Sequence, residues 1–367
     1  MKILLVAGGT AGHTSPMIAT AEAIKLVCPQ AELLCVGTSK GLETTVVPAA
    51  GLPLRLIPPV PLPHRMCVDV LKLPWRLWRA TVQAGAILRE FGADVVAGFG
   101  GYVSLPVYLA ARRARVPVVV QEQNVLPGLA NKIAARFAAA VLTSFPGTPL
   151  RGAEFVGMPV RRAITDLAAR GRSADNAAPR DAFGLPHQGP VLLVSGGSQG
   201  ARTLNEAVAG ARDRLLQAGI SVLHVWGSLN FPEGAPVVEA AGGARYVPWR
   251  FVDEMAQAYA AADLMLARSG ASTVTETGSV GLPCIFVPWP HGNGEQQRNA
   301  ASLVDAGAGL LVHDADMTPD NLVAMVLPLM GDAARLQAMG QAAAEVMRPG
   351  SADRVARVIV RTGGGDA

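Results

Sequence analysis

Two segments about 190 residues apart share one pattern: an apolar strand, a glycine-rich turn and the start of a helix. Residues 3–13 read ILLVAGGTAGH and residues 191–202 read VLLVSGGSQGAR. Glycines let the backbone turn sharply and bring its N–H groups close to a ligand, and a helix N-terminus attracts an anion such as phosphate. The repetition therefore predicts two doubly wound α/β halves, each with a phosphate-type site.

Short apolar strand candidates alternate with longer helical patterns in both halves. The strands are expected at 2–7, 32–37, 94–98, 117–121 and 140–143, and again at 191–195, 221–226, 263–267, 284–287 and 309–312. Such alternation is typical of parallel sheets with helices on both faces. Serine followed by proline predicts helix starts at Ser15-Pro16 and at Ser104 with Pro106. A domain boundary is expected near 157–164, and two late helices (332–347 and 351–361) could pack on either half.

The composition is that of an ordered globular protein in which charge is unevenly distributed. Half of the 367 residues are apolar and 16% are charged. Residues 1–160 hold 15 Lys and Arg against 8 Asp and Glu, whereas residues 161–367 hold 17 against 20. A net charge of +7 on the first half favours an anionic partner for that half, and we expect no nucleic-acid partner.

The cysteines and the apolar stretches predict a cytoplasmic protein. No pair of cysteines has CxxC or metal-ligand spacing, so all four are interpreted as free thiols in a reducing compartment: Cys28, Cys35, Cys67 and Cys284. The apolar run at the N-terminus stops at Gly8-Gly9, too early for a signal peptide. The longest uncharged stretch, 95–111, is interrupted by glycines and a proline and cannot span a bilayer as one helix.

The segment 60–90 has a composition suited to a membrane surface. Apolar and cationic side chains are interleaved in it: Trp75, Trp78, Leu71, Leu73 and Leu77 with Arg65, Lys72, Arg76, Arg79 and Arg89. Apolar groups can enter the lipid interface while cations meet anionic headgroups. An ordinary amphipathic helix with its tryptophans in the core explains the pattern equally well.

The first glycine-rich loop does not have the features of a dinucleotide site. It lacks GxGxxG spacing, and Val36-Gly37-Thr38 stands where a ribose-binding acid is needed, so no nicotinamide cofactor is expected. His13 follows this loop directly at a helix start. An imidazole changes charge near neutral pH and suits a general base, although a capping role is the plainer explanation.

Two more polar loops follow strands of the first half. Residues 98–104, GFGGYVS, form a second glycine-rich loop before a helix, and two such loops suit a diphosphate or a bulky anionic acceptor. Gln121, Glu122, Gln123 and Asn124 stand at the end of the next strand. Such a cluster is better explained by hydrogen bonds to a polyhydroxylated ligand than by solvation, the alternative being a polar turn.

The second half places phosphate, ribose and sugar binders on successive loops. Residues 195–202 repeat the glycine-rich turn, and residues 267–276, ARSGASTVTE, open a helix with small side chains. Glu276 lies about one turn into that helix, where a carboxylate can accept two hydrogen bonds from the vicinal hydroxyls of a ribose. Residues 288–297, PWPHGNGEQQ, supply further amides.

These motifs, in this order, resemble the bacterial N-acetylglucosaminyltransferases of glycosyltransferase family 28, which make lipid II from lipid I in peptidoglycan synthesis. The likeness rests on GGTAGH, GFGGYVS, QEQN, GMPVR, GGSQGAR, ARSGASTVTE and the loop to Gln296, and it covers nearly the whole chain. It implies a GT-B fold with two Rossmann-like lobes: an acceptor- and membrane-facing lobe over 1–160, completed by a returning final helix at about 345–367, and a donor lobe over 161–344. It also implies peripheral attachment to the inner face of the cell membrane through the 60–90 segment.

The resemblance assigns a role to each matching position. Contacts with UDP-N-acetylglucosamine fall on Thr10, Ala11 and Gly12 at the cleft, Asn124 and Gln296 at the sugar, Arg161 and Ser198 at the diphosphate, Val252 at the uracil, Glu276 at the ribose, and Ala271, Ser272, Thr273, Val274 and Thr275 at the phosphates. The lipid I acceptor falls to Gly100, Gly101 and Tyr102. Ala11 and Met158 depart from the usual Gly and Asn of the family.

The implied reaction inverts the anomeric carbon, as the C4 hydroxyl of the acceptor attacks while UDP leaves. The only D-x-D sequence, at 314–316, follows a late strand outside the motifs, so we expect no metal ion and assign the leaving charge to backbone N–H groups, helix N-termini and Arg161. His13 is the first choice for the base and Glu122 the second.

Three other functions remain open at this point. A UDP-sugar transferase with another acceptor would share the donor motifs, although the 60–90 segment favours a lipid-linked acceptor. A UDP-N-acetylglucosamine 2-epimerase would share both architecture and donor, without need of a lipid. A non-catalytic sugar-nucleotide sensor would need fewer ligand loops than the sequence provides.

Overall fold

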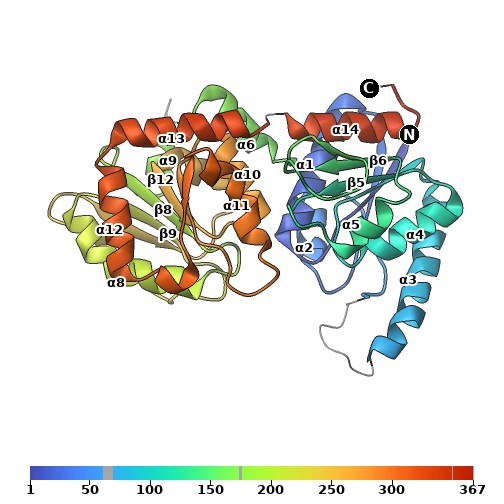
Figure 1. Cartoon of the computed structure of the whole chain (residues 1–367), viewed down its shortest axis with the longest axis horizontal. Helices are drawn as coiled ribbons and strands as arrows, with labels where there is room; N and C mark the ends of the chain where they lie inside the picture. The colour runs from blue at the N-terminus through green and yellow to red at the C-terminus, as the bar shows by residue number, and fades with distance from the viewer. Residues whose placement is uncertain (61–68, 173–175, 349, 367) are drawn as a thin grey trace. The chain divides into compact units, whose positions relative to one another are not determined.

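The chain forms two compact units. The computed structural model describes residues 1–60, 69–172, 176–348 and 350–366 (Figure 1). The first unit comprises Met1–Arg161 together with Gly350–Ala367, and the second comprises Arg162–Pro349. The C-terminal segment therefore belongs to the first unit, although it follows the second in sequence.

The first unit is built on a seven-stranded sheet in the order β3-β2-β1-β4-β5-β6-β7, and every pair of neighbours is parallel. Its strands are β1 (Lys2–Val6), β2 (Glu32–Gly37), β3 (Leu54–Leu56), β4 (Val95–Gly98), β5 (Val118–Glu122), β6 (Ala140–Thr143) and β7 (Ala153–Phe155). Its helices are α1 (Ala11–Val27), α2 (Glu43–Ala49), α3 (Asp69–Phe91), α4 (Ser104–Ala114), α5 (Leu129–Ala134) and α14 (Ser351–Thr362).

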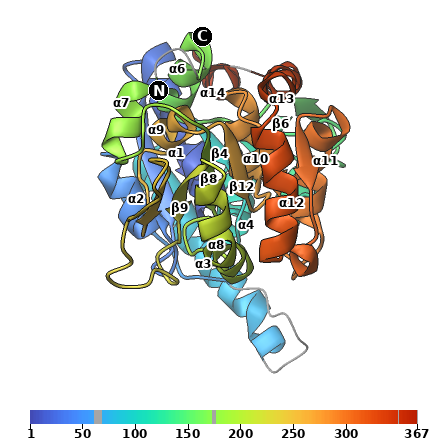
Figure 2. The same ribbon diagram turned by 90° about the vertical axis from the view of Figure 1, so that its left-hand side faces the viewer.

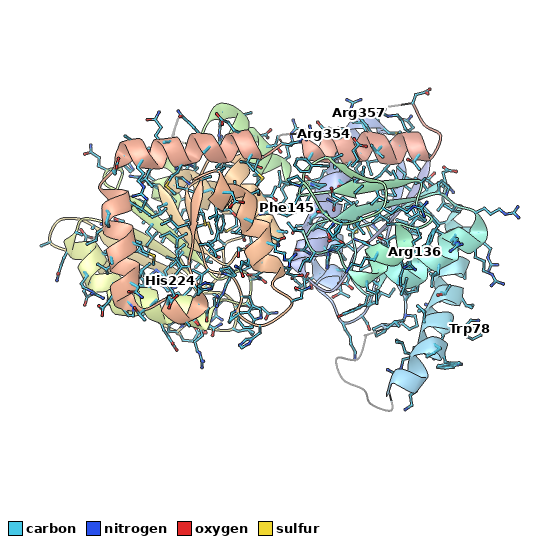
Figure 3. The ribbon with its side chains drawn as sticks, in the orientation of Figure 1. Trp78, Arg136, Phe145, His224, Arg354 and Arg357 are labelled. Atoms are coloured by element: carbon cyan, nitrogen blue, oxygen red, sulfur yellow. The ribbon has the colours of Figure 1, made fainter. Side chains whose placement is uncertain are left out.

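Both faces of this sheet are buried, which explains why its strands are continuously apolar. Ile3 and Leu5 of β1 point into a core shared with α1 and with Val355 of α14, whereas Leu4 and Val6 point into the core formed with α3 and α4. Arg354 of α14, labelled in Figure 3, donates from Nη2 to the carbonyl oxygen of residue 156 at 2.8 Å. Apolar packing and this bond hold the last helix on the first unit.

The second unit repeats the plan with a sheet in the order β10-β11-β9-β8-β12-β13-β14. Its strands are β8 (Val191–Ser195), β9 (Ser221–Val225), β10 (Val238–Glu239), β11 (Arg245–Trp249), β12 (Leu264–Ala267), β13 (Cys284–Phe286) and β14 (Gly309–Leu311). Its helical elements are α6 (Arg162–Arg170), α7 (Ala177–Ala182), α8 (Arg202–Gln217), α9 (Met255–Ala261), α10 (Ala271–Ser279), α11 (Glu295–Asp305), the 3-10 turn Asp314–Asp316, α12 (Pro319–Met330) and α13 (Ala333–Val346). Only the β10–β11 pair is antiparallel among the pairs of the described sheet.

The predicted fold class is confirmed, and several details differ. The first helix begins at Ala11 rather than at Ser15, so Pro16 lies inside α1 instead of opening it. Helix α4 does begin at Ser104, as predicted. Four strands were not predicted: β3, β7, β10 and β11.

Three of the four cysteines are free, as predicted, and all three are also buried: Cys28, Cys35 and Cys284. Burial raises the pKa of the Cys35 thiol to about 12 and that of Cys284 well above its ordinary value, so these thiols stay protonated. Cys67 lies outside the described residues. In the part of the chain that is described, no single helix is long and apolar enough to cross a membrane, while the bent pair Pro319–Met330 and Ala333–Thr362 qualifies by length and composition only when taken together.

Candidate functional site

The strand order reverses between β1 and β4 in the first unit, and open α/β sheets bind ligands where such a reversal occurs. The loops that follow these two strands lie against each other. Gly101 adopts a φ of +82°, and a Cβ on it would lie 2.4 Å from the carbonyl oxygen of Gly8. Only glycine allows this approach, so the paired loops depend on Gly101.

His13 lies in the first turn of α1, at the edge where these loops meet. Its Nδ1 is 2.8 Å from Oε1 of Gln123, at the end of β5. A Cβ on Gly100 would lie 3.4 Å from Cε1 and Nδ1 of His13, so the ring rests against this glycine. The structure thus brings together His13, Gly100 and the QEQN segment, three features that the sequence placed far apart.

Glu122, the second candidate base, is already occupied by three donors. Its Oε1 accepts from the backbone N–H of Asn124 at 3.0 Å, and its Oε2 accepts from the N–H of Gly128 at 3.0 Å and from Nδ2 of Asn131 at 2.9 Å. Only 1% of the residue is exposed. This carboxylate orders the 124–128 loop and positions Asn124, which argues for a structural role.

A buried carboxylate fills the first glycine-rich loop. Glu43 of α2 accepts from the Gly9 N–H at 3.1 Å, and from the N–H and hydroxyl of Thr38 at 2.8 and 2.9 Å. The side chain is fully buried. The Gly9 amide therefore binds an internal anion, and the phosphate-type site predicted for this loop does not have that N–H available.

The candidate donor residues of the second unit follow the carboxyl ends of neighbouring strands. Val252 follows β11, Ser198 follows β8, the 271–276 segment follows β12, and Gln296 follows β13. In this sheet the strand order reverses between β8 and β12. The two glycine- and serine-rich loops therefore stand at the position where doubly wound sheets bind nucleotides.

The N-terminus of α10 carries two hydroxyls that have no hydrogen-bond partner. Oγ of Ser269 and Oγ of Ser272 are buried and unpaired in the structure. Buried polar groups are nearly always hydrogen-bonded, so an unpaired pair beside a helix N-terminus points to a ligand with acceptor oxygens. Ser272 was predicted as a phosphate contact. Ser269 was not, although it lies in the same motif.

Glu276 is 8% exposed and is oriented by a tyrosine that sequence reasoning missed. The hydroxyl of Tyr259 on α9 donates to Oε2 of Glu276 at 2.7 Å. Nothing in the sequence marked Tyr259, because it lies in an alanine-rich helix 17 residues upstream. The bond fixes the direction of the carboxylate proposed to hold the ribose.

Gln296 has a defined amide orientation. Its Oε1 accepts from the backbone N–H of Trp289 at 2.9 Å, so its Nε2 is left as a hydrogen-bond donor. The Trp289 ring is half exposed and stacks with the Arg268 guanidinium, 5.3 Å from the ring centroid.

Arg268 ties the ends of three strands together. Its Nη1 donates to the carbonyl oxygens of Val287 and Pro288 at 3.1 and 3.2 Å and pairs with Asp314 at 2.5 Å. Thr203 donates to the other oxygen of Asp314 at 3.1 Å. Asp314 of the D-x-D sequence was expected outside the motifs, but it is the counter-ion of an arginine within one. Among the described residues, no group of three or more His, Cys, Asp or Glu side chains is arranged to hold a metal ion.

The loop that carries Ser198 is supported by a neutral histidine network. The backbone carbonyl oxygen of Trp226 packs against Gly200, where a Cβ would lie only 2.0 Å from it. Nδ2 of Asn205 donates to the same carbonyl oxygen at 3.1 Å. Oδ1 of Asn205 therefore accepts from Nε2 of His224 at 3.1 Å, and Nδ1 of His224 accepts from the hydroxyl of Tyr246 at 2.9 Å. Burial lowers the pKa of His224 to about 3. Figure 3 shows His224 within the second unit.

The predicted donor residues are divided between the two units. Thr10, Ala11, Gly12, Asn124 and Arg161 belong to the first unit, and the remaining nine belong to the second. Thr10 is the residue before α1, Ala11 begins that helix, and Arg161 is the last residue before the second unit. The predicted acceptor contacts Gly100, Gly101 and Tyr102 lie together in the loop after β4.

Helix α3 exposes the aromatic side chains that the sequence singled out. Trp75 and Trp78 are 59% and 62% exposed, and Val82 is 52% exposed. Placement of the tryptophans in the core is therefore wrong, although Leu73 and Leu77 do pack against the core. The start of α3 projects away from the sheet in both ribbon views (Figures 1 and 2). Figure 3, which labels Trp78, shows this side chain pointing outward from the helix. Residues 61–68, including Arg65, lie outside the described part of the chain.

Comparison with known proteins decides the family. The glycosyltransferase family 28 N-terminal domain matches residues 3–143, and the family 28 C-terminal domain matches residues 191–355. The chain belongs to glycosyltransferase family 28. The resemblance drawn from its motifs is thereby confirmed, and the chain is a glycosyltransferase.

Full-length relatives agree with this assignment. A relative from Nocardioides sp. is 51% identical over 100% of both chains. One from Cutibacterium acnes is 56% identical over 88% of this chain and 87% of its own. Both are named UDP-N-acetylglucosamine--N-acetylmuramyl-(pentapeptide) pyrophosphoryl-undecaprenol N-acetylglucosamine transferase.

Solved structures confirm the GT-B architecture. The crystal structure of MurG from Acinetobacter baumannii has a TM-score of 0.76 and 28% identity, covering 98% of this chain and 99% of that one. A putative UDP-N-acetylglucosamine 2-epimerase from Listeria monocytogenes has a TM-score of 0.64 at 11% identity, covering 100% and 98%. The second likeness shows the shared fold alone.

Proposed function

We propose that this chain transfers N-acetylglucosamine from UDP-N-acetylglucosamine to the C4 hydroxyl of the muramyl sugar of lipid I, giving lipid II for peptidoglycan. The observation that carries the proposal is the 51% identity, over the entire chain, to a relative named for this transfer. The site geometry is consistent with that chemistry in both units.

The second unit is the proposed donor lobe. The α10 N-terminus and the unpaired hydroxyls of Ser269 and Ser272 suit the diphosphate. The oriented carboxylate of Glu276 suits the ribose, and Nε2 of Gln296 suits a sugar oxygen. As the glycosidic bond breaks, negative charge grows on the β-phosphate, and N–H groups and hydroxyls fixed in advance stabilise it. Arg161, assigned by the resemblance, adds positive charge.

The first unit is the proposed acceptor lobe. His13 takes the proton of the attacking hydroxyl, and the adjoining loop of Gly100, Gly101 and Tyr102 receives the acceptor. His13 is preferred over Glu122 because three donors already engage the Glu122 carboxylate. Glu122 instead holds the loop that presents Asn124.

Helix α3 is the proposed contact with the cytoplasmic face of the membrane. Trp75, Trp78 and Val82 are exposed, and the same helix carries Lys72 and Arg79. Aromatic rings enter the lipid interface while cations attract anionic headgroups, which suits an enzyme whose acceptor is anchored in lipid.

The decisive experiment follows UDP release and product identity with a water-soluble lipid I analogue. We expect acceptor-dependent UDP release and a disaccharide product. Formation of a 2-epimer from UDP-N-acetylglucosamine alone would instead identify an epimerase, and rapid UDP release with a different acceptor would change the assigned substrate.

Two variants separate the proposed roles. His13→Ala should lower kcat by about 10²- to 10⁴-fold with little change in UDP affinity, because it removes a general base. Glu276→Ala should raise the KM for the donor. Equal loss of kcat and UDP affinity in the first variant, or an unchanged donor KM in the second, would contradict the respective role.

The membrane contact is tested by sedimentation with vesicles of phosphatidylglycerol and phosphatidylcholine. Trp75→Ala with Trp78→Ala should weaken binding to the anionic vesicles. Leu26→Ala serves as the control, since Leu26 is 60% exposed on α1 of the same unit. Equal binding of the double variant and the control would refute a role for this face of α3.

A further inference from the structure

The orientation of the Gln123 side chain is fixed by a backbone carbonyl. The amide group of Gln123 approaches the Gln121 carbonyl oxygen at 3.0 Å. A carbonyl oxygen can only accept, so the atom of Gln123 that faces it is Nε2. The other amide atom, Oε1, therefore faces Nδ1 of His13 at 2.8 Å.

The neighbouring Gln121 side chain supports the same orientation independently. Its Nε2 donates to Oγ of Ser144 at 2.8 Å and approaches the carbonyl oxygen of Glu122 at 3.5 Å. Its Oε1 is thereby left as an acceptor, and Nε2 of Gln123 donates to it. Reversal of either amide would place two acceptors or two donors face to face.

The hydrogen-bonded chain from Ser144 through Gln121 and Gln123 ends at the imidazole of His13. Because Oε1 of Gln123 has no proton, Nδ1 of His13 must donate to it. In the neutral imidazole the remaining nitrogen, Nε2, then carries the lone pair. In the described part of the chain, the structure gives Nε2 of His13 no hydrogen bond.

We infer that Gln123 is a positioning residue that holds His13 in the Nδ1–H tautomer, with Nε2 as its proton-accepting atom. The inference deepens the proposed function, since it rests on His13 being the base of the transfer. An imidazole that donates through one nitrogen to a fixed acceptor is both oriented and restricted to one tautomer, as in hydrolases where a carboxylate does this. Here a neutral amide does it.

The surrounding charges do not provide another partner for the imidazole. Glu122 lies on the same strand as Gln121, and both of its carboxylate oxygens accept hydrogen bonds, from Asn124, Gly128 and Asn131. The carboxylate of Glu43 on α2 accepts hydrogen bonds from Gly9 and Thr38. The other titratable group of this network, Tyr108 of α4, donates its hydroxyl to Asn131 at 2.8 Å. Gln123 is thus the side chain that orients the ring.

Nitrogen NMR of ¹⁵N-labelled full-length protein tests the tautomer directly. The chain has six histidines, and loss of one signal set in His13→Asn identifies His13. At a pH where the ring is neutral, we expect a protonated Nδ1 and an unprotonated Nε2. A protonated Nε2 in the unaltered protein would overturn the inference. In Gln123→Leu we expect the signals to move toward the Nε2–H form, and unchanged signals would also overturn it.

Kinetics with UDP-N-acetylglucosamine and a water-soluble lipid I analogue provide the second test. Gln123→Leu should lower kcat by about 10- to 100-fold while the donor KM changes less than about twofold, since only the orientation of the base is lost. Gln83→Leu is the matched control, because Gln83 also donates to a backbone carbonyl, that of Leu56 at 3.1 Å, in the same unit. Equal kcat in the two variants would refute the inference.

Substitution of Gln123 by glutamate tests the contact through the pH dependence of kcat, which would not change if Gln123 had only a structural role. Gln123→Glu should shift the acidic limb of the kcat–pH profile to higher pH, because a negative partner stabilises the imidazolium. An unshifted limb in an active variant would count against the contact. Failure of the proposed function is recognised separately: if His13→Ala keeps its kcat, His13 is not the base, whatever tautomer the NMR spectrum shows.

Discussion

Acidification should destabilise the second unit through His224. This side chain is fully buried, its two ring nitrogens are engaged with Tyr246 and Asn205, and burial lowers its pKa to about 3. The unfolded chain binds a proton at this residue with a pKa of about 6.5. Between these two values the unfolded state holds more protons than the folded state, so stability falls as the pH decreases below about 6.5 and the loss is complete near pH 3.

The size of the effect at pH 5 follows from these values. Linkage gives a loss of about 2 kcal/mol between pH 7 and pH 5. Because pH 5 lies well above the folded pKa of His224, the loss is set almost entirely by the unfolded value. Such a loss is a large fraction of the stability of a typical domain.

Urea unfolding at pH 7 and pH 5 measures this loss of stability. The transition of the second unit is followed by the fluorescence of Trp226, in a protein whose other four tryptophans are replaced by phenylalanine. The same measurement on His224→Leu in that background subtracts every other titrating group. We expect the parent to lose about 2 kcal/mol more than the variant. An equal loss in both proteins would refute the reasoning, since the variant has no imidazole at this position.

Three further predictions follow from single contacts. Tyr259→Phe should raise the donor KM about fivefold with kcat nearly unchanged, because Glu276 loses the hydroxyl at 2.7 Å that orients it; an unchanged KM would contradict this. Glu43→Gln should lower the free energy of unfolding by about 1–3 kcal/mol in a thermal unfolding measurement, because an amide cannot accept from all three donors. The control, Glu22→Gln on the exposed face of α1, should leave the free energy of unfolding nearly unchanged. Gly101→Ala should cost at least about 1–2 kcal/mol from its φ of +82° alone, so unfolding at the same temperature as the parent would argue against the loop contact.

The buried parallel strands were predictable from sequence because they are continuously apolar runs that end at glycine-rich turns. The runs at 2–7 and 191–195 correspond to β1 and β8. Three of the missed strands, β3, β7 and β10, are two or three residues long and lie at sheet edges. The fourth, β11, is paired on both sides, but its sequence RYVPW contains a proline and partly exposed residues. Edge strands bury only part of their surface, so their composition carries little signal.

The residues of the candidate site that lie within short sequence motifs were predictable. Ser272 and Glu276 stood out because small residues and an acid follow a strand. Tyr259 and Glu43 did not, since each acts through a partner distant in sequence: Tyr259 on Glu276, and Glu43 on the Gly9 amide. The start of α1 was misplaced because Ser15-Pro16 has the sequence of a helix cap, whereas the helix begins at Ala11 with Thr10 as its N-cap residue.

The carboxylate of Glu43 makes the two halves of the chain unequal as binding sites for an anion. One copy of the strand–loop–helix unit already contains its own negative charge, so an incoming nucleotide would have to expel a buried side chain and leave Thr38 without its acceptor. The second half has unpaired hydroxyls on Ser269 and Ser272 instead, between β12 and the first turn of α10 and outside its own copy of the unit at 191–202. Two halves that share a backbone pattern therefore offer an anionic group different surroundings: electrostatic repulsion from the buried Glu43 carboxylate in the first half, and unpaired hydroxyl donors in the second.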